Sequence, residues 1–396
     1  MAGDITLSSY DKMFGAAPVT VLFIFDNPIQ DPVETIKRGL SQALVQYYPI
    51  AGRIAAGAAA GELVIKCTGE GVSFVAASAN CAIKDVREFC DSSLEEDLFV
   101  AAEGFSYSEP LLLMQVTVFS CGGFAVGVTW NHAIGDGTGM AQFMRAVGEL
   151  ARGLPPSIMP VRSEDSLLVG MSPFSANLVQ FMGTLQPSTM VSLSITVPSS
   201  LVDRIKCMYT MKYGRTCSVF EAVAAVLWRC RTRATMSDLA ALAVLTFLVN
   251  ARKYAGAREG YYGNCIATQL VTAKSGAVAN GDLMELVKII QHSKDRVPGQ
   301  SDIEELRQLH GYNFFSMSCW RNLGMEALDF GSGQPTRVIG YMQERTMLPC
   351  CATCLPCKDE YNVQSICVKE EHADAFLQEL ANIHLTYNPF PASSKL

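Results

Sequence analysis

The chain has 396 residues, of which 49% are hydrophobic and 17% are charged, and its formal net charge is −7. This length predicts two domains or one large α/β unit, of which we expect two domains. The apolar content predicts packed interiors rather than a disordered chain. The acidic balance argues against nucleic-acid binding, which needs clustered basic side chains. The apolar runs are shorter than a bilayer span and the N-terminus lacks a secretory pattern, so we expect a soluble protein without a membrane segment.

The first half of the chain predicts strands and helices in alternation. Strands are expected at residues 18–26, 61–67, 72–77, 111–119 and 123–131, where apolar residues alternate or form short runs. Helical spacing of apolar residues predicts helices over residues 32–48 and 139–153. The strand that ends at residue 131 runs directly into the glycine-rich stretch WNHAIGDGTG. His132 is therefore expected on a turn between a strand and a helix.

A stretch with prolines, serines and no firm period, from about residue 154 to 187, indicates a crossover between domains. We therefore expect an N-terminal domain over residues 1–172, a crossover over 173–188 and a C-terminal domain over 189–396. In the second half, strands are expected at residues 190–198, 242–250, 261–271 and 314–320, and helices at 201–211, 218–234, 282–294 and 373–385. The alternation predicts an α/β fold.

His132 and Asp136 stand four residues apart among three glycines. The glycine spacing is not that of a dinucleotide or phosphate loop, and the G-x-S-x-G elbow of serine hydrolases is absent from the sequence. A neutral imidazole can take a proton from a hydroxyl or amine and return it to a leaving group, which suits acyl transfer. The stretch alone leaves open the alternative of a His and an Asp bonded to the backbone of a turn.

Four of the 14 cysteines form the cluster CCATCLPC, at Cys350, Cys351, Cys354 and Cys357. Such spacing can indicate zinc, but there is no second cluster and no nearby His. The segment is apolar and ends in a polar turn, as a core strand does. We therefore expect a strand with reduced thiols, and no metal.

The chain ends in Ser394-Lys395-Leu396, the tripeptide read by the peroxisomal import receptor. Proline and serine residues before it favour an exposed tail. The sequence therefore predicts that the protein binds this receptor and is located in the peroxisome, with the cytoplasm as the location otherwise.

Two paired motifs carry a family resemblance. The pattern H-x-x-x-D-G of His132, Asp136 and Gly137, followed by LDFGSGQP at residues 328–335, resembles the HxxxD and DFGWG motifs of the BAHD family of plant acyl-CoA-dependent acyltransferases. Similar segments cover nearly the whole chain: YYPIAGRI (47–54), CTGEG (67–71), VNAR (249–252), GYYGN (260–264) and SCWRNLG (318–324). Within the family, CGGF and AVLWRCRT look most like the branch of benzyl alcohol O-benzoyltransferases and taxane acyltransferases.

The resemblance implies two α/β domains, each with a mixed β-sheet flanked by helices, and a channel between them. His132 would act there as the general base that deprotonates the acceptor hydroxyl, which then attacks the acyl-CoA thioester. Asp136 would brace the turn by pairing with Arg252. Acyl-CoA is then a co-substrate, no cofactor is bound permanently, and we expect a monomer.

The resemblance also assigns roles in the DFGSG loop. Ser332 stands where the family usually has Trp, so its hydroxyl, or that of Ser318, is a candidate donor to the oxyanion. Asp329, Gly331 and Gly333 are expected to shape the loop.

Substrate contacts are expected elsewhere. Thr20, on the first long strand, is a candidate contact for the acceptor. Lys212 and Arg215 precede a helix that begins near Ser218, and a basic pair beside a helix N-terminus can hold the 3′-phosphate of CoA. The alternative for these residues is ordinary solvated charge.

The function expected from these features is transfer of a benzoyl group from benzoyl-CoA to benzyl alcohol, giving benzyl benzoate in benzoate-related or salicylate-related metabolism. The peroxisomal tripeptide favours this donor, because plants form benzoyl-CoA in peroxisomes. An alternative is a hydroxycinnamoyl or acetyl transferase acting on a larger phenolic or terpenoid alcohol. A second alternative, suggested by Ser332, is a catalytically weakened relative with a binding role.

Overall fold

The computed structural model describes residues 3–387, apart from positions 14, 16, 60, 89–96, 101, 103, 104, 107, 163–165, 172–176, 179, 182, 295–310 and 354–359. The chain divides into two compact units. Unit 1 comprises Met1–Met171, Asn250–Ile266 and Trp320–Tyr341, and unit 2 comprises Ser172–Val249, Ala267–Cys319 and Met342–Leu396. This differs from the expected division into 1–172 and 189–396, because two segments of the second half pack within unit 1.

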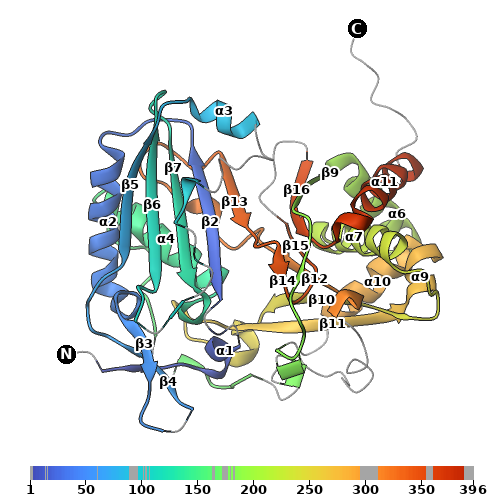
Figure 1. Ribbon diagram of the computed structural model, residues 1–396, viewed down its shortest axis with the longest axis horizontal. Helices are drawn as coiled ribbons and strands as arrows, with labels where there is room; N and C mark the ends of the chain where they lie inside the picture. The colour runs from blue at the N-terminus through green and yellow to red at the C-terminus, as the bar shows by residue number, and fades with distance from the viewer. Residues whose placement is uncertain are drawn as a thin grey trace. The chain divides into compact units, whose positions relative to one another are not determined.

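A mixed sheet forms the centre of unit 1 (Figure 1). Its strand order is β13 (Arg337–Tyr341), β2 (Pro18–Phe25), β7 (Phe124–Asn131), β6 (Leu112–Phe119) and β5 (Ser73–Ala79). β5 and β6 run parallel, and the other neighbours run antiparallel. A smaller sheet contains β1 (Ile5–Thr6), β4 (Leu63–Lys66) and β3 (Arg53–Ala56). β13, from the last segment of unit 1, pairs with β2, which explains why that segment belongs to this unit.

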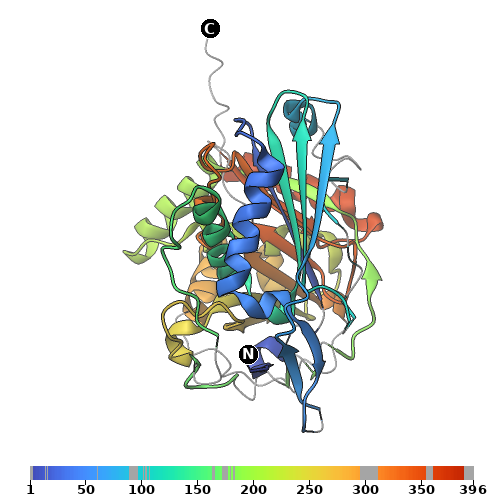
Figure 2. The ribbon, with the colours of Figure 1, turned by 90° about the vertical axis from the view of Figure 1, so that its left-hand side faces the viewer.

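Two long helices of unit 1, α2 (Pro32–Gln46) and α4 (Gly137–Ala151), lie side by side beside the sheet (Figure 2). Both have apolar faces at helical spacing, and these faces are buried. The helices approach closely at Gly39, where a Cβ atom would lie 2.5 Å from the carbonyl oxygen of Val147. Unit 1 also contains the short helices α1 (Ser9–Lys12), α3 (Ile83–Glu88) and α8 (Arg252–Ala255).

Unit 2 has its own mixed sheet, in the order β11 (Ile266–Lys274), β10 (Leu242–Asn250), β12 (Phe314–Cys319), β15 (Cys350–Thr353), β16 (Glu360–Ile366) and β9 (Leu193–Pro198). β10, β12 and β15 run parallel, whereas β15, β16 and β9 alternate in direction. Its helices include α6 (Ser199–Tyr213), α7 (Val219–Thr235), α9 (Ser275–Asn280), α10 (Leu283–Lys294) and α11 (Glu370–Tyr387). β8 (Ser188–Thr189) and β14 (Arg345–Thr346) form a separate pair.

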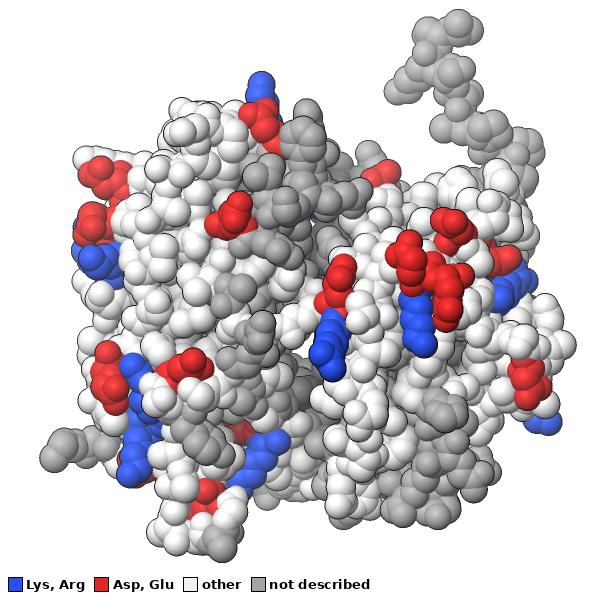
Figure 3. Space-filling model, viewed as in Figure 1, with Lys and Arg blue, Asp and Glu red and all other residues white. Residues whose placement is uncertain are grey.

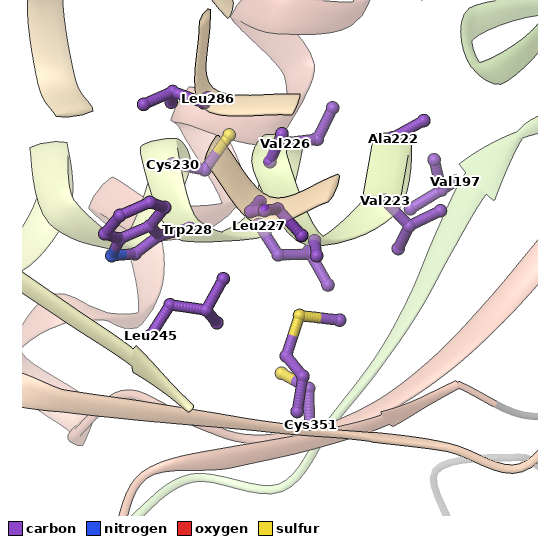
Figure 4. Close-up of a cluster of buried hydrophobic side chains, with 14 of the residues drawn as sticks. Val197, Ala222, Val223, Val226, Leu227, Trp228, Cys230, Leu245, Leu286 and Cys351 are labelled. Atoms are coloured by element: carbon purple, nitrogen blue, oxygen red, sulfur yellow. The ribbon is translucent and has the colours of Figure 1, made fainter. Parts of the chain in front are cut away.

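The core of unit 2 is built around α7, whose buried side chains include Leu227 and Trp228 (Figure 4). They belong to the same hydrophobic cluster as Leu245 of β10, Cys351 of β15 and Leu286 of α10. All residues of α7 from Glu221 to Thr232 are buried, including Arg229 and Arg231, so the helix is covered on several sides. α7 is therefore a central element of its unit rather than a surface helix.

The α/β class with mixed sheets that the sequence indicated is confirmed. One local difference concerns residues 261–265, which were expected to begin a strand but precede β11 as a loop. This loop packs against the turn that follows β7, as described below. Among the described residues, no helix has both the length and the apolar character that a bilayer span needs.

Candidate active site

His132 follows directly after β7, in the single 3₁₀ turn His132–Ile134. The side chain of Asn131 caps this turn, and Trp130 Nε1 donates to the carbonyl oxygen of Gly135 at 3.1 Å. The backbone N–H of His132 donates to the carbonyl oxygen of Ala17, just before β2, at 2.9 Å. These bonds fix the half-buried histidine at the end of the strand, on the strand-to-helix turn that the sequence predicted.

The glycines of this turn allow the backbone of the 261–265 loop to approach closely. A Cβ atom at Gly139 would lie 1.8 Å from the carbonyl oxygen of Tyr262, and one at Gly135 would lie 2.7 Å from the same atom. Neither position accepts a side chain unless the backbone moves. The spacing of glycines in WNHAIGDGTG is therefore explained by close packing of the 261–265 loop.

Asp136 caps α4 and forms an ion pair with Arg252. Its Oδ1 accepts the N–H of Gly139 at 2.9 Å, and its Oδ2 accepts the N–H of Cys265 at 2.9 Å. Arg252 donates to both oxygens, at 2.9 and 2.8 Å, and also to the carbonyl oxygen of Gly263 at 2.8 Å. The Asp136 side chain is 1% exposed. A buried carboxylate satisfied by a bidentate guanidinium and two backbone donors is a structural brace rather than a reacting group.

Asn264 determines which nitrogen of His132 carries a hydrogen. Its Nδ2 donates to the carbonyl oxygen of His132 at 2.7 Å and to Oδ1 of Asp11 at 3.0 Å. Its own Oδ1 therefore faces His132 Nδ1, at 3.0 Å. An amide oxygen only accepts, so Nδ1 is the protonated nitrogen and Nε2 keeps its lone pair. This is the tautomer that a general base acting through Nε2 needs.

Withdrawal of the ring from water lowers the pKa of His132 below its ordinary 6.5. The hydrogen bond to Asn264 and the negative charges of Asp136 and Asp11 act in the opposite direction, with smaller effect. The imidazole is consequently neutral at neutral pH and able to accept a proton.

The DFGSG loop lies at the other end of α4. Asp329 pairs with Arg152, the residue that ends this helix, at 2.9 Å, and it accepts the N–H groups of Gly331 and Gly333. α4 has 15 residues, so its ends are about 22 Å apart. Asp136 and the His132 turn lie at the opposite end. Asp329 and the two glycines, both with positive φ, shape the loop.

The expected role of Ser332 as an oxyanion donor is therefore not supported. The carbonyl oxygen of Ser332 accepts from Asn27, which follows the end of β2, whereas the start of β2 pairs with Asn131 next to His132. β2 has eight residues, so this strand alone places Asn27 about 26 Å from the histidine turn. The serine at position 332, where the family usually has Trp, therefore lies in a loop remote from His132.

Thr20 is 5% exposed, and its hydroxyl lies 2.9 Å from that of Thr129 on the neighbouring strand. Thr129 donates to the carbonyl oxygen of Val100 at 2.9 Å, so Thr20 is the donor in the pair. The proposed contact of Thr20 with the acceptor is therefore not supported, because its hydroxyl is used inside the sheet. Ser318 is half-buried on β12 in unit 2.

Lys212 does not offer a free ammonium group for a phosphate. Its Nζ lies 2.6 Å from Oδ2 of Asp282 and 3.0 Å from Oε1 of Glu285. These carboxylates raise the pKa of Lys212. The expected CoA contact at Lys212 stays a prediction, in which the phosphate would compete with these two carboxylates. Arg215 is exposed nearby in the chain.

The N-terminus of α7 is also occupied. Ser218 caps the helix, and the carboxylate of Glu221 accepts the N–H of Ser218 at 2.8 Å in a capping box. Lys294 pairs with Glu221 at 2.7 Å. A carboxylate already stands where a phosphate was expected. On the face shown in Figure 3, lysines and arginines lie singly or beside acidic residues rather than in one basic patch.

Cys350 and Cys351 lie on β15, so the strand expected at this segment is confirmed for these two residues. Burial raises the pKa of Cys350 to about 12 and also raises that of Cys351, so without a metal ion both are protonated thiols at neutral pH. Within the residues that the structure describes, no three His, Cys, Asp or Glu side chains are grouped to hold a metal ion. Cys354, Cys357 and the tripeptide Ser394-Lys395-Leu396 lie outside the described residues.

The structure adds three residues for which the sequence analysis named no role: Asn264, Asp11 and Arg162. Asn264 ends the GYYGN segment that supported the family resemblance, so it could have been examined individually. Asp11 stands three residues after Ser8, a spacing that marks a capping box. Arg162 carries no local signal, because it lies between prolines and serines in the region expected as a crossover.

Comparison with known proteins gives a family. The model of the Transferase family matches residues 1–380. Acyl transferase 15 of Oryza sativa subsp. japonica is 44% identical over 97% of this chain and 95% of its own length. A myricetin 3-O-glucosyl 1,2-rhamnoside 6'-O-caffeoyltransferase, AT2 of Crocosmia x crocosmiiflora, is 32% identical over 95% and 94%. The 3'-N-debenzoyl-2'-deoxytaxol N-benzoyltransferase of Taxus canadensis is 33% identical over 83% and 78%.

Solved structures share the fold. Vinorine synthase superposes with a TM-score of 0.73 at 17% identity, over 97% of this chain and 94% of its own. TRI101 of F. graminearum, complexed with coenzyme A and T-2 mycotoxin, superposes with a TM-score of 0.73 at 15% identity, over 94% and 96%. The chain therefore belongs to the Transferase family, the BAHD acyltransferases that its HxxxD and DFGSG motifs resemble, and it is an acyl-transferring enzyme.

Proposed function

We propose that the protein transfers an aromatic acyl group from a CoA thioester to the hydroxyl group of an alcohol, with His132 as general base. The observation that carries this proposal is the 3.0 Å contact between His132 Nδ1 and Asn264 Oδ1, because it leaves the lone pair on Nε2. The use of CoA is supported by the TRI101 structure, which is complexed with coenzyme A.

The chemistry proceeds in two proton transfers. Nε2 of His132 takes the hydroxyl proton while the alcohol oxygen attacks the thioester carbonyl, giving a tetrahedral oxyanion and an imidazolium. The intermediate then collapses, the C–S bond breaks, and the imidazolium returns the proton to the departing sulfur. The products are an ester and free CoA, and His132 returns to its neutral form. No acyl-enzyme is needed, because the alcohol attacks the thioester directly.

The donor and acceptor that we propose are benzoyl-CoA and a small alcohol such as benzyl alcohol. The benzoyl group is supported by the Taxus canadensis relative, an N-benzoyltransferase that is 33% identical. We further propose that the enzyme acts in the peroxisome as a monomer. The location is supported by the terminal Ser394-Lys395-Leu396, which fits the import receptor.

A second candidate function is transfer of a hydroxycinnamoyl group to a larger phenolic acceptor. It is favoured by the caffeoyltransferase of Crocosmia x crocosmiiflora, which is 32% identical over 95% of this chain. The two candidates share the base and the carrier. They differ in the acyl group and in the size of the acceptor.

A panel assay separates these candidates. Purified protein is given benzoyl-CoA, caffeoyl-CoA or acetyl-CoA with benzyl alcohol or a flavonol glycoside, and the ester is identified by mass, with heat-inactivated protein as the control. We expect the benzoyl ester of benzyl alcohol to form fastest. Faster caffeoyl transfer to the glycoside would support the second candidate. No ester from any pair would overturn the proposed function and favour a binding role.

A further inference from the structure

Asp11 is a buried carboxylate with a large number of donors. It lies in α1 and is 1% exposed. Its Oδ2 accepts the N–H and the hydroxyl of Ser8, at 2.9 and 2.7 Å, and lies 3.2 Å from Arg162. Its Oδ1 accepts both the N–H and Nδ2 of Asn264, at 3.1 and 3.0 Å. One side of this carboxylate therefore faces a counter-ion, and the other faces the residue that contacts His132.

We propose that Asp11 is a positioning residue for His132 that acts through Asn264, by fixing the orientation of the Asn264 amide and by stabilising the positive charge that forms on His132 during transfer. This inference rests on the proposed role of His132 as the base. Asp11 touches neither the imidazole nor, in our mechanism, the substrate.

The orientation follows from the chemistry of the groups. A carboxylate only accepts hydrogen bonds, so the Asn264 atom that faces Asp11 must be Nδ2 and the atom that faces His132 must be Oδ1. An asparagine at position 11 would carry its own NH₂ group and would remove one of the two acceptors of Asn264 Nδ2, leaving the carbonyl oxygen of His132 at 2.7 Å as the other. The Asn264 amide would then turn in a fraction of the molecules. In the turned state Nδ2 would face His132 Nδ1, which would have to accept, and the imidazole hydrogen would move to Nε2. That tautomer cannot take a proton from the alcohol at Nε2.

Two carboxylates, Asp11 and Asp136, lie near His132 and favour a positive charge on its ring. Asp136 forms a bidentate ion pair with Arg252 and accepts two backbone N–H groups, and of the two carboxylates it has the larger effect on the pKa of His132. Asp11 has one guanidinium contact, with Nη2 of Arg162 at 3.2 Å. The same nitrogen also donates to the carbonyl oxygen of Ala133 at 3.4 Å. The negative charge of Asp11 raises the pKa of His132 in the same direction as that of Asp136, with a smaller effect. An imidazolium that forms two hydrogen bonds away is stabilised by it, since electrostatic interactions are strong in such a buried site.

Neighbouring titratable side chains are neutral at neutral pH. Burial raises the pKa of Cys265 to about 12 and raises that of Tyr261. Burial also raises the pKa of Tyr10 on α1. The charged groups that face the histidine turn from the described elements packed against it are thus Asp11 and Arg162 on one side and Asp136 and Arg252 on the other.

The first test measures the tautomer in the resting protein. Two-bond nitrogen–hydrogen NMR spectra of protein with ¹⁵N-labelled histidine distinguish a protonated ring nitrogen from one with a lone pair, and a His132→Gln sample assigns the signal. We expect the hydrogen on Nδ1 in the wild type. In Asp11→Asn we expect a second population with the hydrogen on Nε2, partial because the carbonyl oxygen of His132 still accepts from Asn264 Nδ2. A wild-type signal with the hydrogen on Nε2, or a variant signal identical to the wild type, would overturn the proposal. The wild-type spectrum is informative even if the variant does not fold.

The second test measures the rate of ester formation as a function of pH. The rate falls on the acidic side as His132 becomes protonated, and we call this fall the acidic limb. Removing the negative charge in Asp11→Asn lowers the pKa of His132, so its limb should move to lower pH by on the order of half a unit to one unit. Removing the counter-ion in Arg162→Gln raises that pKa, so its limb should move to higher pH. The turnover number of Asp11→Asn should fall by about tenfold, with a smaller change in KM.

Asp329→Asn is the matched control, because it also removes a carboxylate paired with an arginine of unit 1, at 2.9 Å, at the far end of α4. Asp329→Asn should change neither the tautomer of His132 nor the pH of the acidic limb. A purely structural role of Asp11 would lower activity without moving the limb, and this outcome would contradict the charge argument. Because the tautomer is measured without substrate, failure of the proposed acyl transfer is recognised separately, by activity that survives loss of His132.

Discussion

Replacement of Arg252 by methionine tests how the histidine turn is braced. Asp136, which is 1% exposed in the wild type, would keep the N–H groups of Gly139 and Cys265 but lose both guanidinium bonds, at 2.9 and 2.8 Å. Removing one partner of a buried ion pair costs about 3–5 kcal/mol, because the remaining charge stays desolvated. The Arg252 side chain is 17% exposed, so we expect a value near the lower end, about 3 kcal/mol.

The assay is thermal unfolding of the wild type and of Arg252→Met. For a folding unit of this size, a loss of about 3 kcal/mol lowers Tm by about 6–12 °C. Arg152→Met is the control, since it breaks a more exposed pair with Asp329, with side chains 31% and 25% exposed, on the same helix. The control should cost less than about 1 kcal/mol. Equal shifts for the two variants, or a shift of Arg252→Met below about 2 °C, would refute this view of the brace.

Three further predictions concern the site and the expected CoA contact. Because the pKa of His132 is lowered, protonation should reduce kcat/KM only at pH values below 6.5, and a limb above 6.5 would contradict this. Gly139→Ala should lower stability by more than about 2 kcal/mol in chemical denaturation, because its Cβ would lie 1.8 Å from the Tyr262 carbonyl oxygen; an unchanged midpoint would contradict the contact. Lys212→Ala should leave KM for acyl-CoA within about twofold, because Asp282 already holds its ammonium group; a clear rise would support the phosphate role.

Local patterns predicted the elements well. The alternation around Thr20 and the helical spacing from Val33 to Tyr47 correspond to β2 and α2, because burial of one face imposes a period on the sequence. The division into units was predicted less well. β13 joins unit 1 through pairing with β2, and such a long-range pairing leaves no mark within either segment.

The site was predicted in part for the same reason. His132 and Asp136 are neighbours in sequence, so their motif is visible in one stretch. The orientation of His132 depends on Asn264 and Asp11, which are separated by 253 positions in the chain. The role considered for Ser332 came from its place in a motif, and a motif does not say at which end of α4 its loop packs. Folding places Asn264 and Asp11 beside the histidine turn and Ser332 far from it, and none of these placements is visible in a local stretch of sequence.

The most direct test of the account is ester formation by His132→Gln at saturating acyl-CoA and alcohol. Glutamine keeps a polar side chain of similar reach but cannot act as a base near neutral pH. If His132 Nε2 is the general base, the turnover number should fall by about 10²–10⁴-fold while the variant unfolds at the wild-type temperature. A folded variant whose turnover remains within about tenfold of the wild type would contradict the account.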